Sequence, residues 1–240
     1  DPKDKSPPEL TTAFSTGDSA GLLYPPFKPK ILEDHGEWVV RRTSMGTIVR
    51  ERKDKMTLPI FISGPVQNRD DWERLKDERL KYEPEQRFPN DWDDVTKPFR
   101  SRDRDYPVSL HIDIWRTISY LMGNVTLLKT AIRDPDLIRD MANTLADLWA
   151  RILPKMLRST KADIVWIGED MCYKNGPFIS PKLYRELFFN AYKKVISVSK
   201  DNGVKIIGLD TDGDCRLLIP CLLYTSDAAD EGLGVDLGGR

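Results

Sequence analysis

The sequence predicts an α/β fold with a parallel sheet, and three observations between residues 162 and 214 support this prediction. Residues 163–167 form a short apolar run rich in β-branched and aromatic side chains, which is typical of a buried strand. A helical pattern then covers 180–203, and residues 204–209 form a second apolar run. Strand, helix and strand in this order make a βαβ unit, so we expect two parallel strands joined by a right-handed crossover.

The helix of this unit has recognisable ends. Ser180 is suited to cap its N-terminus, and Pro181 occupies the first helical position, where a missing N–H costs nothing. Gly203 is suited to the left-handed conformation that ends many helices. Between these ends, apolar residues recur at helical spacing: Leu183, Leu187, Ala191, Val195 and Val198.

The chain begins with segments of a different character. Residues 1–30 contain six prolines and no periodic pattern, so we expect an irregular N-terminal segment. Residues 37–43 and 47–52 are strand-like and flank Gly46, which predicts a hairpin with glycine at its turn. Residues 58–62 are a further short apolar run.

A short helix is expected over residues 68–81, followed by an excursion over 83–105 that is rich in proline and charge. The large apolar residues of these two segments are expected to be buried: Trp72, Leu75, Trp92 and Phe99.

Residues 108–113 predict another strand, which places His111 and Asp113 on one face near its C-terminal end. A lone histidine in such a position is more often a hydrogen-bonded core residue than a ligand. Both roles stay open, because histidine is also the side chain that titrates near neutral pH.

Three helical patterns connect this strand to the βαβ unit. They cover 114–122 and 125–132, and a third begins where Asp134 precedes Pro135, a cap followed by a first-turn proline. We expect Pro154 to kink or end the third helix.

Carboxylates gather where the two strands of the βαβ unit end. Glu169 and Asp170 follow the first strand, and Asp210, Asp212 and Asp214 follow the second. The carboxyl ends of parallel strands meet at one edge of a sheet, where ligands bind in such folds. Close carboxylates repel each other, so we expect a raised pKa at one of them, or a compensating cation. Aspartate also favours caps and turns, and that structural role stays open.

Composition excludes several classes of protein. The 240 residues suffice for one large domain, and a net charge of -1 argues against non-specific nucleic-acid binding. No apolar run approaches the roughly 20 residues of a membrane span. An odd set of cysteines without a CxxC motif (Cys172, Cys215 and Cys221) favours a reducing compartment, so we expect a cytoplasmic protein.

The segments GEDMCYKNGPFISPKLYRELFFNAYKKV (168–195) and GLDTDGD (208–214) resemble the uroporphyrinogen decarboxylase superfamily. The preceding YLMGNVTLLKTAIRDPDLIRDMANTLADLW (120–149) is similar to the helices that lead to this loop in the family. The resemblance extends over roughly residues 31–220. It implies a (β/α)8 TIM-barrel domain, incomplete at both ends, with a substrate cleft at the carboxyl ends of its strands.

The resemblance implies two chemistries. The leading expectation is a uroporphyrinogen decarboxylase-like lyase of porphyrin metabolism, which needs no cofactor or metal. The alternative is a corrinoid-dependent methyltransferase that transfers a methyl group to or from a small acceptor, with a corrinoid protein as partner and a metal as a further requirement. The sequence departs from both: Asp170 replaces a hydroxyl-bearing residue of the decarboxylases, and Asp210 and Asp212 replace the His and Cys of the zinc motif in the methyltransferases.

From these departures we expect Asp170 and Asp212 to be catalytic, with no metal site. The residues expected to bind substrate are Glu169, Asp210, His111, Asp113, Tyr173 and Lys174. We expect a small-molecule substrate as the binding partner, and no nucleic acid or membrane. Two alternatives stay open: that the full-length protein forms a homodimer, and that it binds a ligand without catalysing a reaction.

Residues 221–240 lose the alternation of strands and helices and resemble translated library-adaptor sequence. The chain also starts without methionine. We therefore expect a fragment whose barrel lacks its first and last strands, a tail over 221–240 that packs poorly, and a 240-residue chain that is insoluble or molten when expressed alone.

Overall fold

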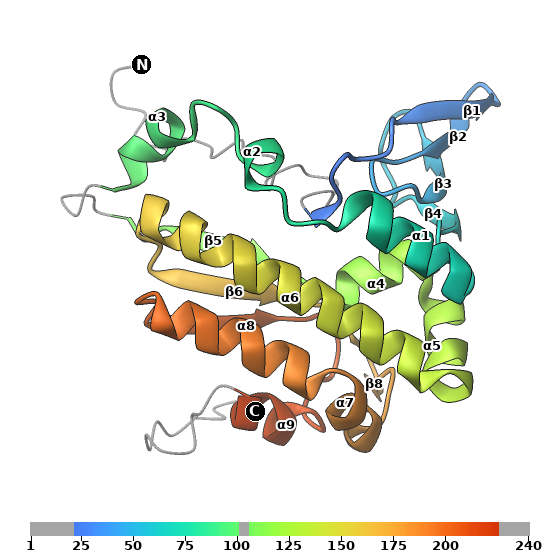
Figure 1. Ribbon diagram of the computed structural model, residues 1–240. Coiled ribbons are helices and arrows are strands. Elements are labelled where there is room, and N and C mark those ends of the chain that lie inside the picture. Colours follow the sequence, from blue (N-terminus) through green and yellow to red (C-terminus); the bar gives the residue numbers. More distant parts are fainter. Residues whose placement is uncertain (1–21, 101–105, 226–240) are drawn as a thin grey trace.

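The computed structural model describes residues 22–100 and 106–225 and has two main sheets, shown in Figure 1. The first sheet is antiparallel with the order β1-β2-β3-β4. The second is parallel with the order β5-β6-β9, and β7 and β8 form a small hairpin. The strands are β1 Lys30–Asp34, β2 Trp38–Arg42, β3 Ile48–Arg52, β4 Ile60–Ser63, β5 Ser109–Ile112, β6 Ile164–Gly168, β7 Cys172–Tyr173, β8 Gly176–Pro177 and β9 Ile206–Asp210.

The helices begin where the sequence supplies caps. The side chains of Asn68, Asp134 and Ser180 each accept a hydrogen bond from a backbone N–H in the first turn that follows. The helical segments are α1 Arg69–Arg79, α2 Pro84–Arg87, α3 Trp92–Thr96, η2 Lys97–Phe99, α4 Trp115–Met122, α5 Asn124–Arg133, α6 Pro135–Thr160, α7 Pro181–Leu187, α8 Phe189–Asp201 and α9 Ile219–Thr225. None of them is long and apolar enough to cross a membrane, as far as residues 22–100 and 106–225 are concerned.

The parallel sheet confirms the predicted βαβ unit. β6 and β9 are hydrogen-bonded neighbours, and β5 pairs with the other edge of β6. α6 and α8 lie side by side across one face of this sheet (Figure 1), where Val165 and Ile167 are buried. The opposite face, called here the inner face, carries His111, Trp166 and Gly208 in register across the three strands.

The barrel expectation is correct only in part. The fold is mixed α/β, but the sheets of the described residues do not close into a barrel, because three parallel strands cannot complete one. The N-terminal strands are antiparallel instead, since the short connection between β2 and β3 permits only a hairpin. Gly46 supplies the expected positive φ at that turn, +81°.

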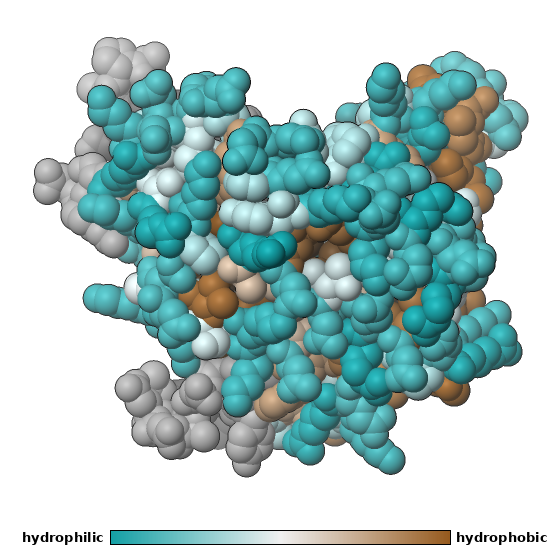
Figure 2. All heavy atoms as spheres, in the orientation of Figure 1, coloured by the Kyte–Doolittle hydropathy of each residue, from teal (hydrophilic) through white to brown (hydrophobic). Residues whose placement is uncertain are grey.

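The four-stranded sheet carries exposed apolar side chains, and Figure 2 shows hydrophobic residues gathered on this part of the molecule. They come from β1, β4 and the loop before β4: Ile31, Leu32, Met56, Leu58, Ile60, Phe61 and Ile62. The residues expected to be buried in the following segments are buried, which confirms that prediction: Trp72, Leu75, Trp92 and Phe99.

Helix boundaries differ from expectation in two places. Pro154 does not end α6, which continues to Thr160 because the side chains on both sides of the proline are buried. The helix expected over 180–203 is divided at Phe188 into α7 and α8. The boundary expected at residue 220, between the barrel domain and the tail, falls within α9, where Cys221 is buried. Most of the two expected end segments, residues 1–21 and 226–240, lies outside the described residues.

Candidate functional site at the carboxyl ends of the parallel strands

The loops after β6 and β9 lie against each other, as the sequence predicts. The backbone N–H of Glu169 donates to the carbonyl oxygen of Asp210 at 2.6 Å, and that of Met171 donates to Oγ1 of Thr211 at 3.2 Å. These bonds join the two acidic loops into one edge, which we call the rim. It is the edge at which parallel α/β folds bind ligands.

Glu169 turns inward from the rim and is 1% exposed. Its Oε1 accepts hydrogen bonds from the Ile114 N–H at 2.6 Å and the Tyr192 hydroxyl at 2.8 Å, and its Oε2 accepts from the Arg116 N–H at 2.7 Å. Two of these donors are backbone groups at the start of α4, where unpaired N–H groups and the helix dipole favour a carboxylate. Glu169 therefore ties the end of β6 to the beginning of α4.

Glu169 lies within electrostatic range of a second buried carboxyl group, that of Asp113. Burial, and then the negative charge of Asp113, raises the pKa of Glu169 to about 8, although the three donated hydrogen bonds oppose this rise. Burial also raises the pKa of Asp113, while the Thr117 hydroxyl and Arg116 act to lower it. The raised carboxylate pKa expected at this edge is therefore found at an inward-facing pair, Glu169 and Asp113.

Three of the predicted residues are exposed on the rim: Asp170, Asp210 and Asp212. Their side chains make no hydrogen bond or ion pair with any residue in the described part of the chain. Tyr173 is 57% exposed at the tip of the β7–β8 hairpin, and the ammonium of Lys174 lies 5.9 Å from the centre of its ring. The rim thus combines three free carboxylates with an aromatic ring.

The inner face leads up to the rim. A Cβ atom added to Gly208 would lie 2.2 Å from the Trp166 ring, so this ring lies directly over the glycine. His111 is exposed next to Trp166. Partial burial, and then the positive charge of Arg116, lowers the pKa of His111, while Asp210 opposes this shift. His111 therefore lies within electrostatic range of both Arg116 and Asp210.

Arg116 belongs to the site, although the sequence analysis did not identify it. Its Nη2 is 3.8 Å from Oδ2 of Asp113. A Cβ on Gly168 would lie 2.9 Å from the same nitrogen, so the guanidinium lies against the end of β6. The available signal was its position three residues after Asp113, at the start of a helix that follows a strand.

Comparison with known families assigns the chain. The family model described as uroporphyrinogen decarboxylase (URO-D) matches residues 39–218, a range that includes the whole rim. The chain belongs to the URO-D family. Its members are enzymes, decarboxylases and methyltransferases among them.

A solved structure described as a methyltransferase from Methanosarcina mazei is similar to this URO-D chain, with 14% sequence identity and a TM-score of 0.49. The similarity covers 76% of this chain and 51% of the other, so the chain spans about half the length of that structure. No match was found among curated proteins.

Asp210 and Asp212 do not fit the zinc motif that the resemblance implies for the methyltransferase branch. Zinc prefers nitrogen and sulfur ligands, and the two motif positions are Asp210 and Asp212. Residues 22–100 and 106–225 contain no group of three His, Cys, Asp or Glu side chains arranged to hold a metal ion. We therefore derive no step through a bound metal.

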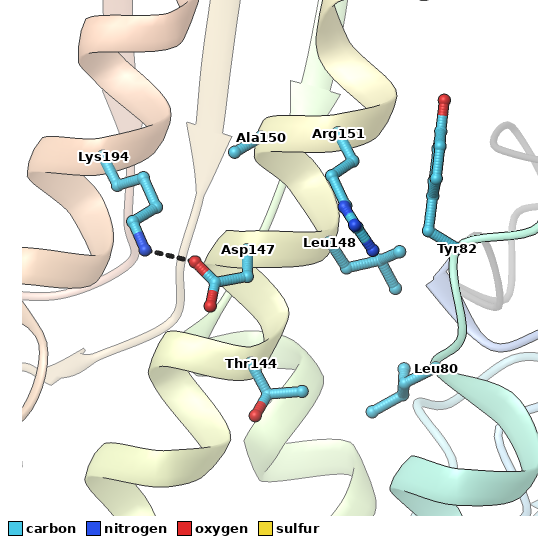
Figure 3. A pocket seen from close by; sticks show the side chains of 8 residues that line it. All are labelled: Leu80, Tyr82, Thr144, Asp147, Leu148, Ala150, Arg151 and Lys194. Atoms are coloured by element: carbon cyan, nitrogen blue, oxygen red, sulfur yellow. Dashed lines mark hydrogen bonds and ion pairs between the residues drawn. The ribbon is translucent and has the colours of Figure 1, made fainter.

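A hollow of about 560 Å³ lies elsewhere, on the outer side of α6 (Figure 3). It is lined by residues of α6, α8 and the segment from Leu80 to Tyr82, and an ion pair between Asp147 and Lys194 joins α6 to α8 in this lining. It is separated from the rim by the helices that cover the sheet. Ligands of parallel α/β folds bind at the strand ends, so we place the candidate site at the rim.

Proposed function

We propose that this URO-D-family chain forms the substrate-binding rim of a methyltransferase that acts on a small, positively charged, methylated substrate. The observation that carries the proposal is the group of three exposed carboxylates on two loops that are hydrogen-bonded to each other: Asp170, Asp210 and Asp212.

The charge of this group favours a cation. In water, each carboxylate about 4 Å from a positive charge contributes about 1 kcal/mol, and more where the ligand excludes solvent. A substrate that bears several carboxylates, such as a uroporphyrinogen, meets repulsion from the same three side chains. The acidic rim therefore supports methyl transfer over the decarboxylase expectation.

In the proposed reaction, Asp170 and Asp212 bind the cationic centre, and Asp210 lies on the inner side of the rim. The methyl group leaves as a methyl cation equivalent, and the electron pair of the broken bond stays on the substrate nitrogen or sulfur. The substrate thereby loses its positive charge and its attraction to the rim, which favours product release. A corrinoid protein that meets the exposed Tyr173–Lys174 hairpin would supply the methyl acceptor.

Decarboxylation of a tetrapyrrole carboxylate is the second candidate, and the presence of Arg116 at the rim favours it. In that reaction the C–C bond to the carboxylate breaks, carbon dioxide leaves, and the ring carbon keeps the electron pair and takes up a proton. A carboxylate such as Asp212 is suited to stabilise the positive charge of the protonated pyrrole.

The two chemistries are separated by assaying the purified protein in parallel. Methyl transfer predicts formation of methylcobalamin from reduced cobalamin and a methylated ammonium or sulfonium compound, followed by absorbance. We expect Asp170→Asn and Asp212→Asn to raise the KM of the cationic substrate roughly tenfold, the effect of about 1.4 kcal/mol. The matched control is Asp201→Asn, an exposed aspartate at the end of α8. The proposal would be refuted if the protein released carbon dioxide from uroporphyrinogen and showed no methyl transfer above a heat-treated control. If neither assay showed turnover, the result would indicate a binding-only protein.

A further inference from the structure

The guanidinium of Arg116 is held at the rim but is only partly neutralised. Its nearest carboxylate oxygen, Oδ2 of Asp113, is 3.8 Å away, which is beyond hydrogen-bonding distance. Its Nε atom is buried and has no hydrogen-bond partner among the described residues. The described residues therefore leave much of the hydrogen-bonding capacity of this guanidinium unused, and its exposed part can bind a ligand.

The position of Arg116 is set by its surroundings. Its backbone N–H is bound by Oε2 of the buried Glu169, which fixes the first turn of α4. Gly168 leaves the space that the guanidinium occupies, because any larger residue there would place a Cβ 2.9 Å from Nη2. The side chain is still 28% exposed, so a ligand on the inner face can reach it.

An acidic residue lies one strand away and does not pair with this arginine. Gly168 is opposite Asp210 in the β6–β9 register, and neighbouring strands are about 5 Å apart. Asp210 and Arg116 nevertheless form no ion pair within 4 Å. Opposite charges are thus presented at the ends of two neighbouring strands.

We propose that Arg116 binds a carboxylate group of the substrate, so that the rim recognises a small zwitterion with its carboxylate at Arg116 and its cationic centre at the rim carboxylates Asp170, Asp212 and Asp210. Guanidinium groups bind carboxylates through two parallel hydrogen bonds, and the exposed part of the Arg116 side chain is available to donate them. Glu169 and Gly168 are positioning residues in this arrangement. The inference rests on the proposed function in one respect, namely that the rim is where the substrate binds.

His111 offers a direct readout of an anion at Arg116. The protein has two histidines, and His35 lies on the antiparallel sheet, where it stacks on Trp38 and hydrogen-bonds to Glu33. Proton NMR titration of both imidazoles would be recorded in sodium acetate and in sodium chloride of equal ionic strength. We expect acetate to raise the pKa of His111 in a saturable manner, because it neutralises the nearby guanidinium, and to leave His35 unchanged.

Variants decide whether Arg116 is responsible. Arg116→Gln should abolish the acetate response, and Arg185→Gln, an exposed arginine on α7, should retain it. An equal acetate response in wild type and Arg116→Gln, or no response in either, would overturn the inference. If Arg116→Gln unfolds, Arg116→Lys provides the test, because lysine keeps the positive charge but cannot form the bidentate pair of hydrogen bonds. An acetate affinity of Arg116→Lys equal to that of the wild type would contradict the inference. If the protein binds acetate through Arg116 but transfers no methyl group, the proposed function is wrong and this inference still holds.

Discussion

Replacement of Glu169 by glutamine tests the buried network that joins β6 to α4. The carboxyl group has a pKa of about 8 in the folded protein and an ordinary value of 4.5. Its folded-state pKa is raised, so the folded state holds the proton more tightly than the unfolded state does. Stability is therefore expected to fall as the pH rises from about 4.5 to about 8, and to be level with respect to this group above that range.

The magnitude follows from the size of the shift. Each pKa unit corresponds to about 1.4 kcal/mol, so the full shift would change the unfolding free energy by about 5 kcal/mol. Part of the shift depends on the negative charge of Asp113, whose own pKa is raised by burial, so we expect a smaller loss of about 2–3 kcal/mol between pH 5 and pH 8.

Glutamine cannot ionise and should remove this slope. It also presents an N–H₂ group to one of the backbone donors, at a cost of about 1–2 kcal/mol at pH 5. The stability curves of wild type and Glu169→Gln should therefore converge as the pH rises.

The measurement is urea unfolding of the purified protein, followed by circular dichroism at several pH values between 5 and 9. Glu186→Gln is the matched control, because the Glu186 side chain is 48% exposed and its ion pair with Lys182 is long, at 3.9 Å. Its curve should run parallel to that of the wild type. Parallel curves for wild type and Glu169→Gln would refute the reasoning and show that Glu169 is ionised throughout this range.

Three further substitutions test the fold around the site. Arg87→Met should destabilise the protein by about 3–5 kcal/mol, because the buried guanidinium donates to three backbone carbonyl oxygens and those of Leu22 and Lys81 would lose this bond; a loss below 1 kcal/mol in urea unfolding would contradict this. Gly208→Ala should lower the unfolding free energy by about 1–3 kcal/mol, because the added methyl group clashes with the Trp166 ring. In a Trp166→Leu background the same substitution should cost little, and strictly additive losses of stability would disprove the contact. Ser180→Ala removes the hydrogen bond to the Leu183 N–H and should lower the unfolding free energy by about 1 kcal/mol, whereas Ser180→Asp should retain the cap.

The inward position of Glu169 also links the fold to the chemistry of the rim. The same carboxylate that fixes the start of α4 sets the place of Arg116, and its charge is tied to that of Asp113. A substitution at Glu169 should therefore affect substrate affinity through Arg116 even though Glu169 does not face the open rim.

The sequence by itself determined the local elements of this protein. Asn68, Asp134 and Ser180 mark three helix starts, Gly46 marks a hairpin, and the apolar runs around 163–167 and 204–209 mark two parallel strands. These signals work because caps, turns and side-chain periodicity depend on neighbours within a few residues.

Only the tertiary structure decided which carboxylates are free and which are structural. Glu169 and Asp170 are adjacent in sequence, yet one is buried among donors more than 20 residues away in the chain and the other is exposed. The direction of a side chain in a loop depends on the partners that the fold brings to it, and the N–H groups at the start of α4 are such partners for Glu169. The same long-range packing brought Arg116 of α4 to the end of β6; its spacing from Asp113 is visible in the sequence, but its contact with Gly168 is not, because Gly168 is distant in the chain.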